Sequence, residues 1–530
     1  MASSEAAQLT WWRRSDVRYW AAAAITAIVA GLLMSHRVGD APQGFLAYNE
    51  GFYLSNGARD AMRSFFAPIN SPIDPNNPFL YPIALATALR IFGVTTAVAR
   101  GVSIAASTAT ILLTFALGKE LYNERIGLTA AVFFALTPGE MLVGRNIQVD
   151  ALMLTFMVAA SFAFARAAKT QSTGWSAATG ALLGLGVLTK LPALLLVPGF
   201  AVWELWCSHD FSWIRKTSTW VSAAAFSIVA VPWYAYRYLA SSEFRGAQSY
   251  LAGTGGWKGL EFIWNMVFGQ IAWMFSPVLI VVIVASLTYM AVKRQVADKF
   301  VISMFCTLLV VFLFYNYHVY YYLPLVPFGA IASARGTAAA ARWLTRGETP
   351  DASRTFATTL MTATTVLAVV LLGFALMTLS AKKYIGVPTD AHIPLLAAMG
   401  YDPAKLVLGV DDTVNGWEGP AIIYHAQQAG VQVVTFPLRA GATIPADSRL
   451  VVLTAYAQHP GSGARFIGYP IARVVAPVVF GQAVLHLTGA RSYFHLDKPT
   501  LLRVGPWWRF GFEEIPGVQD ETYGLYEIPH

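Results

Sequence analysis

Charged side chains are scarce in this sequence. Asp, Glu, Lys and Arg make up only 12% of its 530 residues, whereas 56% of the residues are hydrophobic. Ordinary soluble domains carry about 25% charged residues, so this chain has too little charge to keep so large a surface in water. Disorder is excluded as well, because disordered chains are poor in the apolar and aromatic residues that abound here. The composition predicts an integral membrane protein.

Cysteine is almost absent, and glycine follows no three-residue period. The two cysteines, Cys207 and Cys306, lie beside or within apolar runs, so the chain has no disulfide framework. The net charge is +8, but Lys and Arg are scattered in ones and twos between apolar runs. This dispersion excludes the clustered basic face of a nucleic-acid-binding protein and is typical of membrane topology signals.

Eleven apolar runs have roughly the length of a membrane-spanning helix. They lie near residues 19–35, 98–117, 126–144, 149–167, 174–189, 191–206, 219–236, 264–291, 300–316, 319–335 and 357–379. The first run is too long for a signal peptide, and no small-residue cleavage pattern follows it. The sequence therefore predicts a polytopic α-helical membrane protein with about 11 spans.

The distribution of cations indicates the orientation of these spans. With the N-terminus in the cytoplasm, each short loop on that side carries Lys or Arg, whereas the short outer loops carry only Arg145 and Lys190. This asymmetry is the positive-inside pattern. Because the number of spans is odd, the C-terminus is expected on the extracytoplasmic side.

Three outer segments are long enough to have a structure of their own. Residues 36–97 form the first outer loop, with amphipathic stretches that should lie on the membrane, and residues 237–263 form a second, glycine-containing loop. The third segment is the tail, 381–530, which follows a transmembrane domain of residues 1–380. In the tail, a helical stretch near 420–429 alternates with β-rich runs at Leu406–Val410, Val431–Phe436, Leu450–Thr454 and Thr500–Val504. This pattern predicts a small extracytoplasmic α/β domain.

Ionisable side chains gather at the outer ends of the predicted spans. The candidates are Glu50, Arg145, Asp150, Lys190 and His318. Charged groups near hydrocarbon are costly and therefore point to function. Acids and cations facing one membrane surface suit a phosphate-bearing substrate, because cations neutralise the phosphate and a carboxylate acts as base.

Structural explanations for the same residues remain open at this stage. Arg145 and Asp150 are also suited to an ion pair that closes a turn, and Lys190 to reaching toward the lipid headgroups. His318 stands among tyrosines that are typical of an interfacial aromatic belt.

The order of motifs resembles that of the polyprenyl-phosphate-sugar-dependent glycosyltransferases of the GT-C fold. Within them the chain is most similar to the protein mannosyltransferase and lipid A aminoarabinose transferase superfamily. The likeness covers about residues 40–335 and is carried by Glu50-Gly-Phe-Tyr53, Asn77-Pro-Phe-Leu-Tyr-Pro82, Gly144–Asp150, Leu188–Pro192 and Tyr322-Leu-Pro-Leu-Val-Pro327.

The resemblance implies where donor and acceptor bind and which residues catalyse transfer. Family members commonly have Asp-Glu where this chain has Asn49 and Glu50, and the first of these carboxylates is often assigned as the catalytic base, so the resemblance implies that Glu50 or Asp150 takes this role. Substrate contacts are expected from Asn49, Tyr53, Asp74, Tyr81, Arg145, Lys190, His318 and Tyr320.

We therefore expect a membrane glycosyltransferase that moves a hexose or pentose from a polyprenyl-phosphate-linked donor to an acceptor outside the cytoplasm. The acceptor, whether protein, lipid or polysaccharide, stays open. No Gly-rich nucleotide-binding loop is visible, which fits a donor delivered by lipid. No cofactor is indicated with certainty, although Glu50 and His318 are able to share a divalent cation. The alternatives are a transporter or flippase for a polyprenyl or other anionic lipid and, less favoured, a scaffold for envelope assembly.

Overall fold

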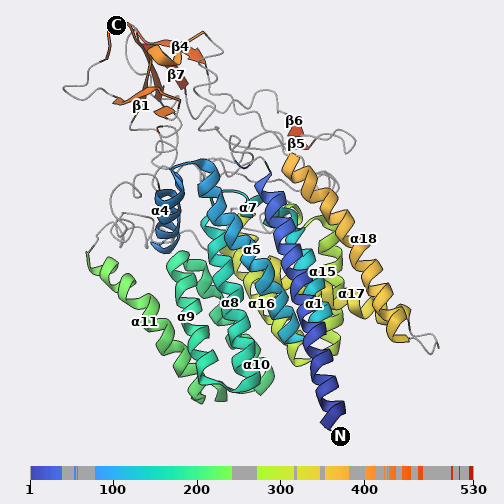
Figure 1. Cartoon of the computed structure of the whole chain (residues 1–530). Coiled ribbons are helices and arrows are strands. Elements are labelled where there is room, and N and C mark those ends of the chain that lie inside the picture. The colour runs from blue at the N-terminus through green and yellow to red at the C-terminus, as the bar shows by residue number, and fades with distance from the viewer. Residues whose placement is uncertain are drawn as a thin grey trace.

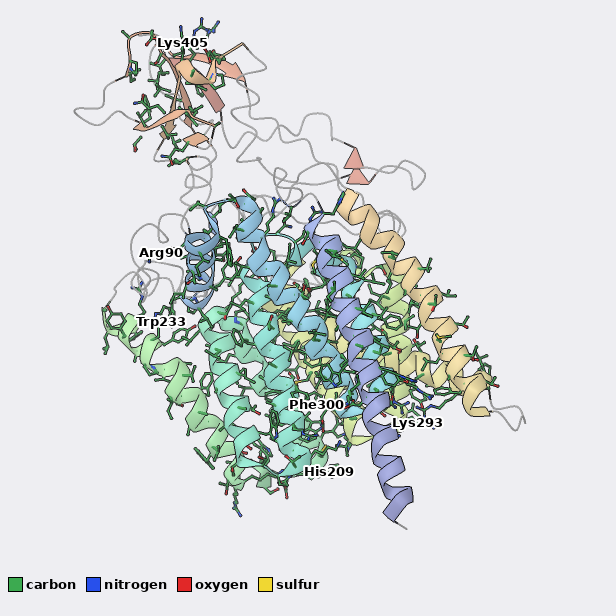
Figure 2. All side chains as sticks on the ribbon, in the orientation of Figure 1. Arg90, His209, Trp233, Lys293, Phe300 and Lys405 are labelled. Atoms are coloured by element: carbon green, nitrogen blue, oxygen red, sulfur yellow. The ribbon has the colours of Figure 1, made fainter. Side chains whose placement is uncertain are left out.

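The computed structural model is a bundle of long helices with a small β-sheet at one end (Figure 1). It describes residues 2–36, 38, 53–54, 57, 78–240, 271–315, 319–345, 352–380, 400–411, 423, 426–427, 429–436, 444–454, 463–468, 503–504, 512–513 and 524–528. The sheet lies beyond the end of the bundle that is opposite the N-terminus. Arg90 and Trp233 mark the end nearer the sheet, and His209 and Lys293 mark the other end (Figure 2).

Within the described residues, helices occur at all eleven predicted positions, and the runs at 126–144 and 191–206 each contain two of them. They are α1 (Ala2–Ser35), α5 (Thr96–Leu121), α6 (Glu124–Ala135), α7 (Pro138–Gly144), α8 (Val149–Thr170), α9 (Thr173–Thr189), η1 (Leu191–Leu195), α10 (Leu196–Ser208), α11 (Thr217–Ala240), α15 (Pro277–Lys293), α16 (Val296–Tyr315), α17 (Leu325–Leu344) and α18 (Ala352–Ser380). Within the described ranges, six helices are long and apolar enough to cross a membrane, or seven if α6 and α7 form one bent span. The prediction of a multi-pass helical membrane protein is confirmed.

Proline divides two of the predicted spans. The run at 126–144 is not one straight helix, because α6 and α7 meet at a bend of 65°. Pro138 lacks the backbone N–H that would continue the hydrogen bonds of α6, and it occupies the first turn of α7, where that N–H is not needed. The run at 264–291 is broken before Pro277 in the same way, between the short α14 (Ala272–Phe275) and α15.

The N-terminal half of the bundle packs in sequence order. Figure 1 shows α5, α8, α9 and α11 side by side, and each of these helices contacts the next. Gly180 allows α9 and α11 to approach closely, because a Cβ there would lie 1.9 Å from the carbonyl oxygen of Ser222 on α11. A 13-residue helix, α4 (Leu80–Phe92), belongs to the predicted first outer loop and packs against α5 and α9.

The described part of the tail is a mixed sheet. Its five strands have the order β2-β1-β3-β7-β4, with β1 (Leu406–Asp411), β2 (Gln432–Phe436), β3 (Arg449–Thr454), β4 (Arg465–Gly468) and β7 (Gly524–Ile528). Strands β2, β1 and β3 are parallel, whereas β7 runs antiparallel to both of its neighbours, β3 and β4. Three predicted strands are confirmed in this sheet. The fourth is described only at β5 (Arg503–Val504), which pairs with β6 (Phe512–Glu513) in a separate two-stranded sheet.

Candidate functional site

A buried ion pair joins two helix ends. Asp150 lies in the first turn of α8, and Lys190 stands at the break between α9 and η1. The Lys190 Nζ lies 2.8 Å and 2.9 Å from the two carboxylate oxygens of Asp150. Asp150 is fully buried and Lys190 is 3% exposed. The start of a helix favours a carboxylate there, because its free backbone N–H groups carry partial positive charge.

The motif around Lys190 explains its position. The backbone of Lys190 is extended, with φ −157° and ψ 132°, and Pro192 sits in the first turn of the following 3-10 helix. Proline fits that first turn but would break a continuous α-helix. The helical path therefore stops at Lys190, which places the ammonium at a helix end beside the first turn of α8.

Two tyrosine rings cover the Lys190 ammonium. Its Nζ lies 4.9 Å from the ring centre of Tyr320 and 4.5 Å from that of Tyr321. The two rings stack on each other with their centres 5.0 Å apart. Both come from η4 (Val319–Tyr322), the turn that precedes α17. Aromatic faces attract a desolvated cation, so these rings help to hold the charge that Asp150 neutralises.

A hydrogen-bond network extends from Asp150 toward the first outer loop. Gln148 Nε2 donates to Asp150 at 3.0 Å, and the Gln148 backbone N–H donates to the Ser103 hydroxyl at 3.1 Å. The same hydroxyl lies 3.1 Å from the Tyr81 hydroxyl. The Tyr53 ring packs edge-on against the Tyr81 ring, with centres 5.4 Å apart. The network therefore links Tyr81 to Asp150 and brings Tyr53 beside it.

Arg145 stands in the connection between α7 and α8, shortly before Asp150. It is buried, and its Nη2 donates to the backbone carbonyl of His36 at 3.0 Å. The buried Arg100 makes a similar bond, from Nη1 to the carbonyl of Val38 at 2.8 Å. These bonds bring both guanidinium groups to the backbone just after α1, at the end of the bundle that is opposite the N-terminus.

The structure changes one interpretation of this turn. An ion pair between Arg145 and Asp150 was an open explanation, but among the described residues the carboxylate pairs with Lys190. Sequence spacing favoured the nearer cation, whereas the fold brings together residues that are 40 positions apart.

Other predicted site residues lie outside the described part of the chain. They are Asn49, Glu50, Asp74 and His318. The possible sharing of a divalent cation by Glu50 and His318 is therefore not described either. Across the described ranges, no group of three or more His, Cys, Asp or Glu side chains is placed to hold a metal ion.

Several residues of the site lie outside the set that the sequence motifs predicted. Gln148 and Tyr321 adjoin motifs that were recognised, so their proximity was a usable signal. Ser103 lies within an alanine-rich apolar run and gives no such signal. Outside this network, the motifs also left out Glu140, a buried carboxylate on α7 that is 1% exposed.

A second buried ion pair joins α16 and α17. Arg335 Nε is 3.4 Å from Asp298, which also accepts a hydrogen bond from the Tyr122 hydroxyl at 2.8 Å. Arg335 is the last residue of the predicted span 319–335, but α17 continues to Leu344, so Arg335 lies within the helix and is buried. Fifteen residues of chain separate it from Tyr320, which corresponds to roughly 20 Å along a helix. This pair joins α5, α16 and α17 and is separate from the Lys190 site.

One family model matches part of the chain. Residues 76–236 match the family described as dolichyl-phosphate-mannose-protein mannosyltransferase. The matched segment includes Tyr81, Arg145, Asp150 and Lys190. No curated protein matches the chain significantly.

Solved structures match over most of the chain. The crystal structure of ArnT from Cupriavidus metallidurans in the apo state gives a TM-score of 0.57 at 13% identity, covering 84% of this chain and 96% of that one. The same protein bound to undecaprenyl phosphate gives a TM-score of 0.58 at 12% identity, with the same coverage. Identity this low shows a shared fold. Motifs, family match and fold together confirm the predicted resemblance to the GT-C-fold membrane glycosyltransferases of the protein mannosyltransferase and ArnT type.

Proposed function

We propose that this protein is a membrane glycosyltransferase that uses a polyprenyl-phosphate-linked monosaccharide as donor. The observation that carries the proposal is the buried Lys190 ammonium, held by Asp150 within the segment that matches a mannosyltransferase family. A charge buried at a helix break costs free energy, and a ligand-binding role accounts for its presence. The fold supports the choice of donor, because ArnT of this fold has been solved with undecaprenyl phosphate bound.

Among the described residues, the hydrogen bonds of Lys190 leave one of its N–H groups for a ligand. An ammonium carries three N–H donors, and the two oxygens of Asp150 occupy two of them. The third is available for an oxygen of the donor phosphate. The ion pair between Lys190 and Asp150 is neutral as a whole, so a second cation is needed to balance the phosphate. We assign this role to Arg145, the cation nearest to Asp150 in the sequence.

The proposed reaction is a displacement at the anomeric carbon. The acceptor hydroxyl oxygen attacks this carbon, its proton passes to Glu50, and the bond to the phosphate oxygen breaks. Polyprenyl phosphate leaves, and Lys190 and Arg145 stabilise its growing negative charge. Asn49 cannot accept a proton at neutral pH, but it is able to orient Glu50 or the acceptor.

The contacts of Asp150 favour Glu50 as the base. One oxygen of Asp150 accepts from Lys190, and the other accepts from both Lys190 and Gln148. A carboxylate so engaged is poorly placed to take a proton from an acceptor hydroxyl. We therefore assign Asp150 to positioning Lys190.

The remaining predicted contacts extend the site toward the sugar and the acceptor. We propose that Tyr53, Asp74, Tyr81, His318 and Tyr320 line it. We propose that the reaction takes place on the extracytoplasmic side, on the charge asymmetry of the loops.

The test is a transfer assay with the full chain in membranes. A panel of radiolabelled polyprenyl-phosphate hexoses and pentoses is offered, and label is followed into protein, lipid and polysaccharide fractions. Wild-type protein should transfer at least one sugar, and Glu50→Gln should not. Movement of the labelled lipid across the membrane without transfer, equal in both proteins, would instead support a flippase.

A further inference from the structure

Two arginines share one aromatic ring at the end of the bundle far from the Lys190 site. The guanidinium carbon of Arg342 lies 5.5 Å from the ring centre of Phe356, and that of Arg125 lies 5.9 Å from the same centre. Both distances are within the range of a cation–π contact. Arg125 is in the first turn of α6, Arg342 in the last turn of α17, and Phe356 near the start of α18. The cluster therefore joins three helix ends.

Among the residues that the structure describes, neither guanidinium group has an acidic partner. Several other cations at this end are paired, Arg166 and Lys169 with Glu120 and Lys216 with Glu204. Throughout the described ranges, Arg125 and Arg342 take part in no ion pair, and both are exposed. Two like charges held on one ring repel each other unless an anion lies between them.

The surroundings suit a lipid rather than a soluble anion. Helix α18 is peripheral, because only 11% of the apolar stretch Thr355–Gly373 is buried against the rest of the protein. Lipid chains can therefore reach it. Next to Arg342, Trp343 and Leu344 are 67% and 65% exposed. An exposed tryptophan at a helix end is typical of the headgroup level of a bilayer.

We propose that Arg125, Arg342 and Phe356 form a binding site for the headgroup of an anionic phospholipid. The planar guanidinium fork donates two parallel hydrogen bonds to phosphate oxygens, which an ammonium cannot match. Basic pockets between transmembrane helices bind phosphate headgroups in this way. Phe356 holds both forks in place, and Trp343 and Leu344 contact the upper acyl chains.

Lipid bound at this site should stabilise the fold. A phosphate bound to both arginines connects the start of α6 with the end of α17 and the start of α18. Because a ligand that binds only the folded state stabilises it, anionic lipid should raise the unfolding temperature of the protein. The site is separate from the transferase residues, so it does not depend on the proposed donor.

The experiment uses the full chain, purified in a neutral detergent and freed of lipid. Phosphatidylglycerol or phosphatidylcholine is titrated, and binding is measured by native mass spectrometry and by the unfolding temperature. Wild-type protein should bind phosphatidylglycerol in preference. The double variant R125A/R342A should bind it about tenfold more weakly or worse, because two charge-assisted hydrogen-bonding groups are lost.

Two further variants decide the outcome. R215A/K293A removes two exposed cations from the same end of the bundle and should change the affinity by less than about twofold. R125K/R342K keeps the charge and the helix ends, so it decides the matter if the alanine variant fails to fold. It should bind at least several-fold more weakly than wild type. Equal losses in R125A/R342A and R215A/K293A, full affinity in R125K/R342K, or no preference over phosphatidylcholine would each overturn the proposal.

Discussion

The Lys190 ammonium contacts both carboxylate oxygens of Asp150, at 2.8 Å and 2.9 Å, although 40 residues separate them in the chain. Both side chains are buried. A buried pair of this kind is sensitive to the loss of either partner, because the remaining charge is left without compensation. Comparing the loss of one partner with the loss of both therefore distinguishes the structural role of the pair from its proposed role in catalysis.

Stability and activity should respond differently to changes in this pair. Lys190→Ala and Asp150→Ala should each destabilise the protein by about 3–5 kcal/mol, because each leaves a buried charge unpaired. The double variant should recover much of that loss, yet remain inactive if Lys190 binds the donor phosphate. Thermal unfolding in detergent and transfer assays check the two effects. A double variant with wild-type turnover would return Lys190 to a purely structural role.

Glu50→Gln should lower turnover by about 10² to 10⁴, the usual contribution of a positioned base. Glutamine keeps the size and much of the hydrogen bonding, so donor binding should persist. Asp150→Asn should act through Lys190 and mainly raise the apparent donor constant. Steady-state kinetics over a range of donor concentrations distinguish these effects. If Glu50→Gln is active and Asp150→Asn is dead with normal donor binding, the two roles are reversed.

Most of the helical architecture followed from apolar run length alone. This works because a membrane-spanning segment must satisfy its backbone internally, which leaves few options for an apolar run. The errors came at prolines: Pro138 divides the expected third span, and Pro277 begins a new helix inside the eighth. In the tail, parallel pairing of β1, β2 and β3 joins segments distant in sequence, which strand patterning does not reveal.

The site was harder to predict than the fold. Motif order identified Asp150 and Lys190 individually, but their pairing depends on how α8 and α9 pack against each other. Spacing along the chain favoured Arg145 as the partner of Asp150. Ser103 could not have been found, since a serine in an apolar helix has no sequence mark that separates a network member from a self-satisfied hydroxyl.

The tyrosine rings beside Lys190 should contribute to donor affinity. Tyr321→Leu removes the closer ring, 4.5 Å from the ammonium. A desolvated cation–π contact is worth about 0.5–2 kcal/mol, so the donor constant should rise about 2- to 30-fold. Tyr321→Phe keeps the ring and is the matched control, with an affinity close to wild type. Equal losses in both variants would assign the effect to the hydroxyl group instead.

The two ends of the bundle should differ in their access to water-soluble reagents outside the cell. Loop charges predict that the sheet domain is extracytoplasmic, whereas the loop after α10 is cytoplasmic. Ala404, before β1, and Ser212, after α10, are both exposed and suit single cysteine substitutions.

The native Cys207 and Cys306 are first replaced by serine and alanine, because each would react or complicate the labelling. With intact cells, an impermeant maleimide should label Ala404→Cys and spare Ser212→Cys. After permeabilisation both cysteines should react, which shows that neither thiol is shielded by the protein itself. Labelling of Ser212→Cys alone in intact cells would invert the topology. It would also put Lys190 and Asp150 on the cytoplasmic side, where a sugar donor flipped to the outer leaflet could not reach them.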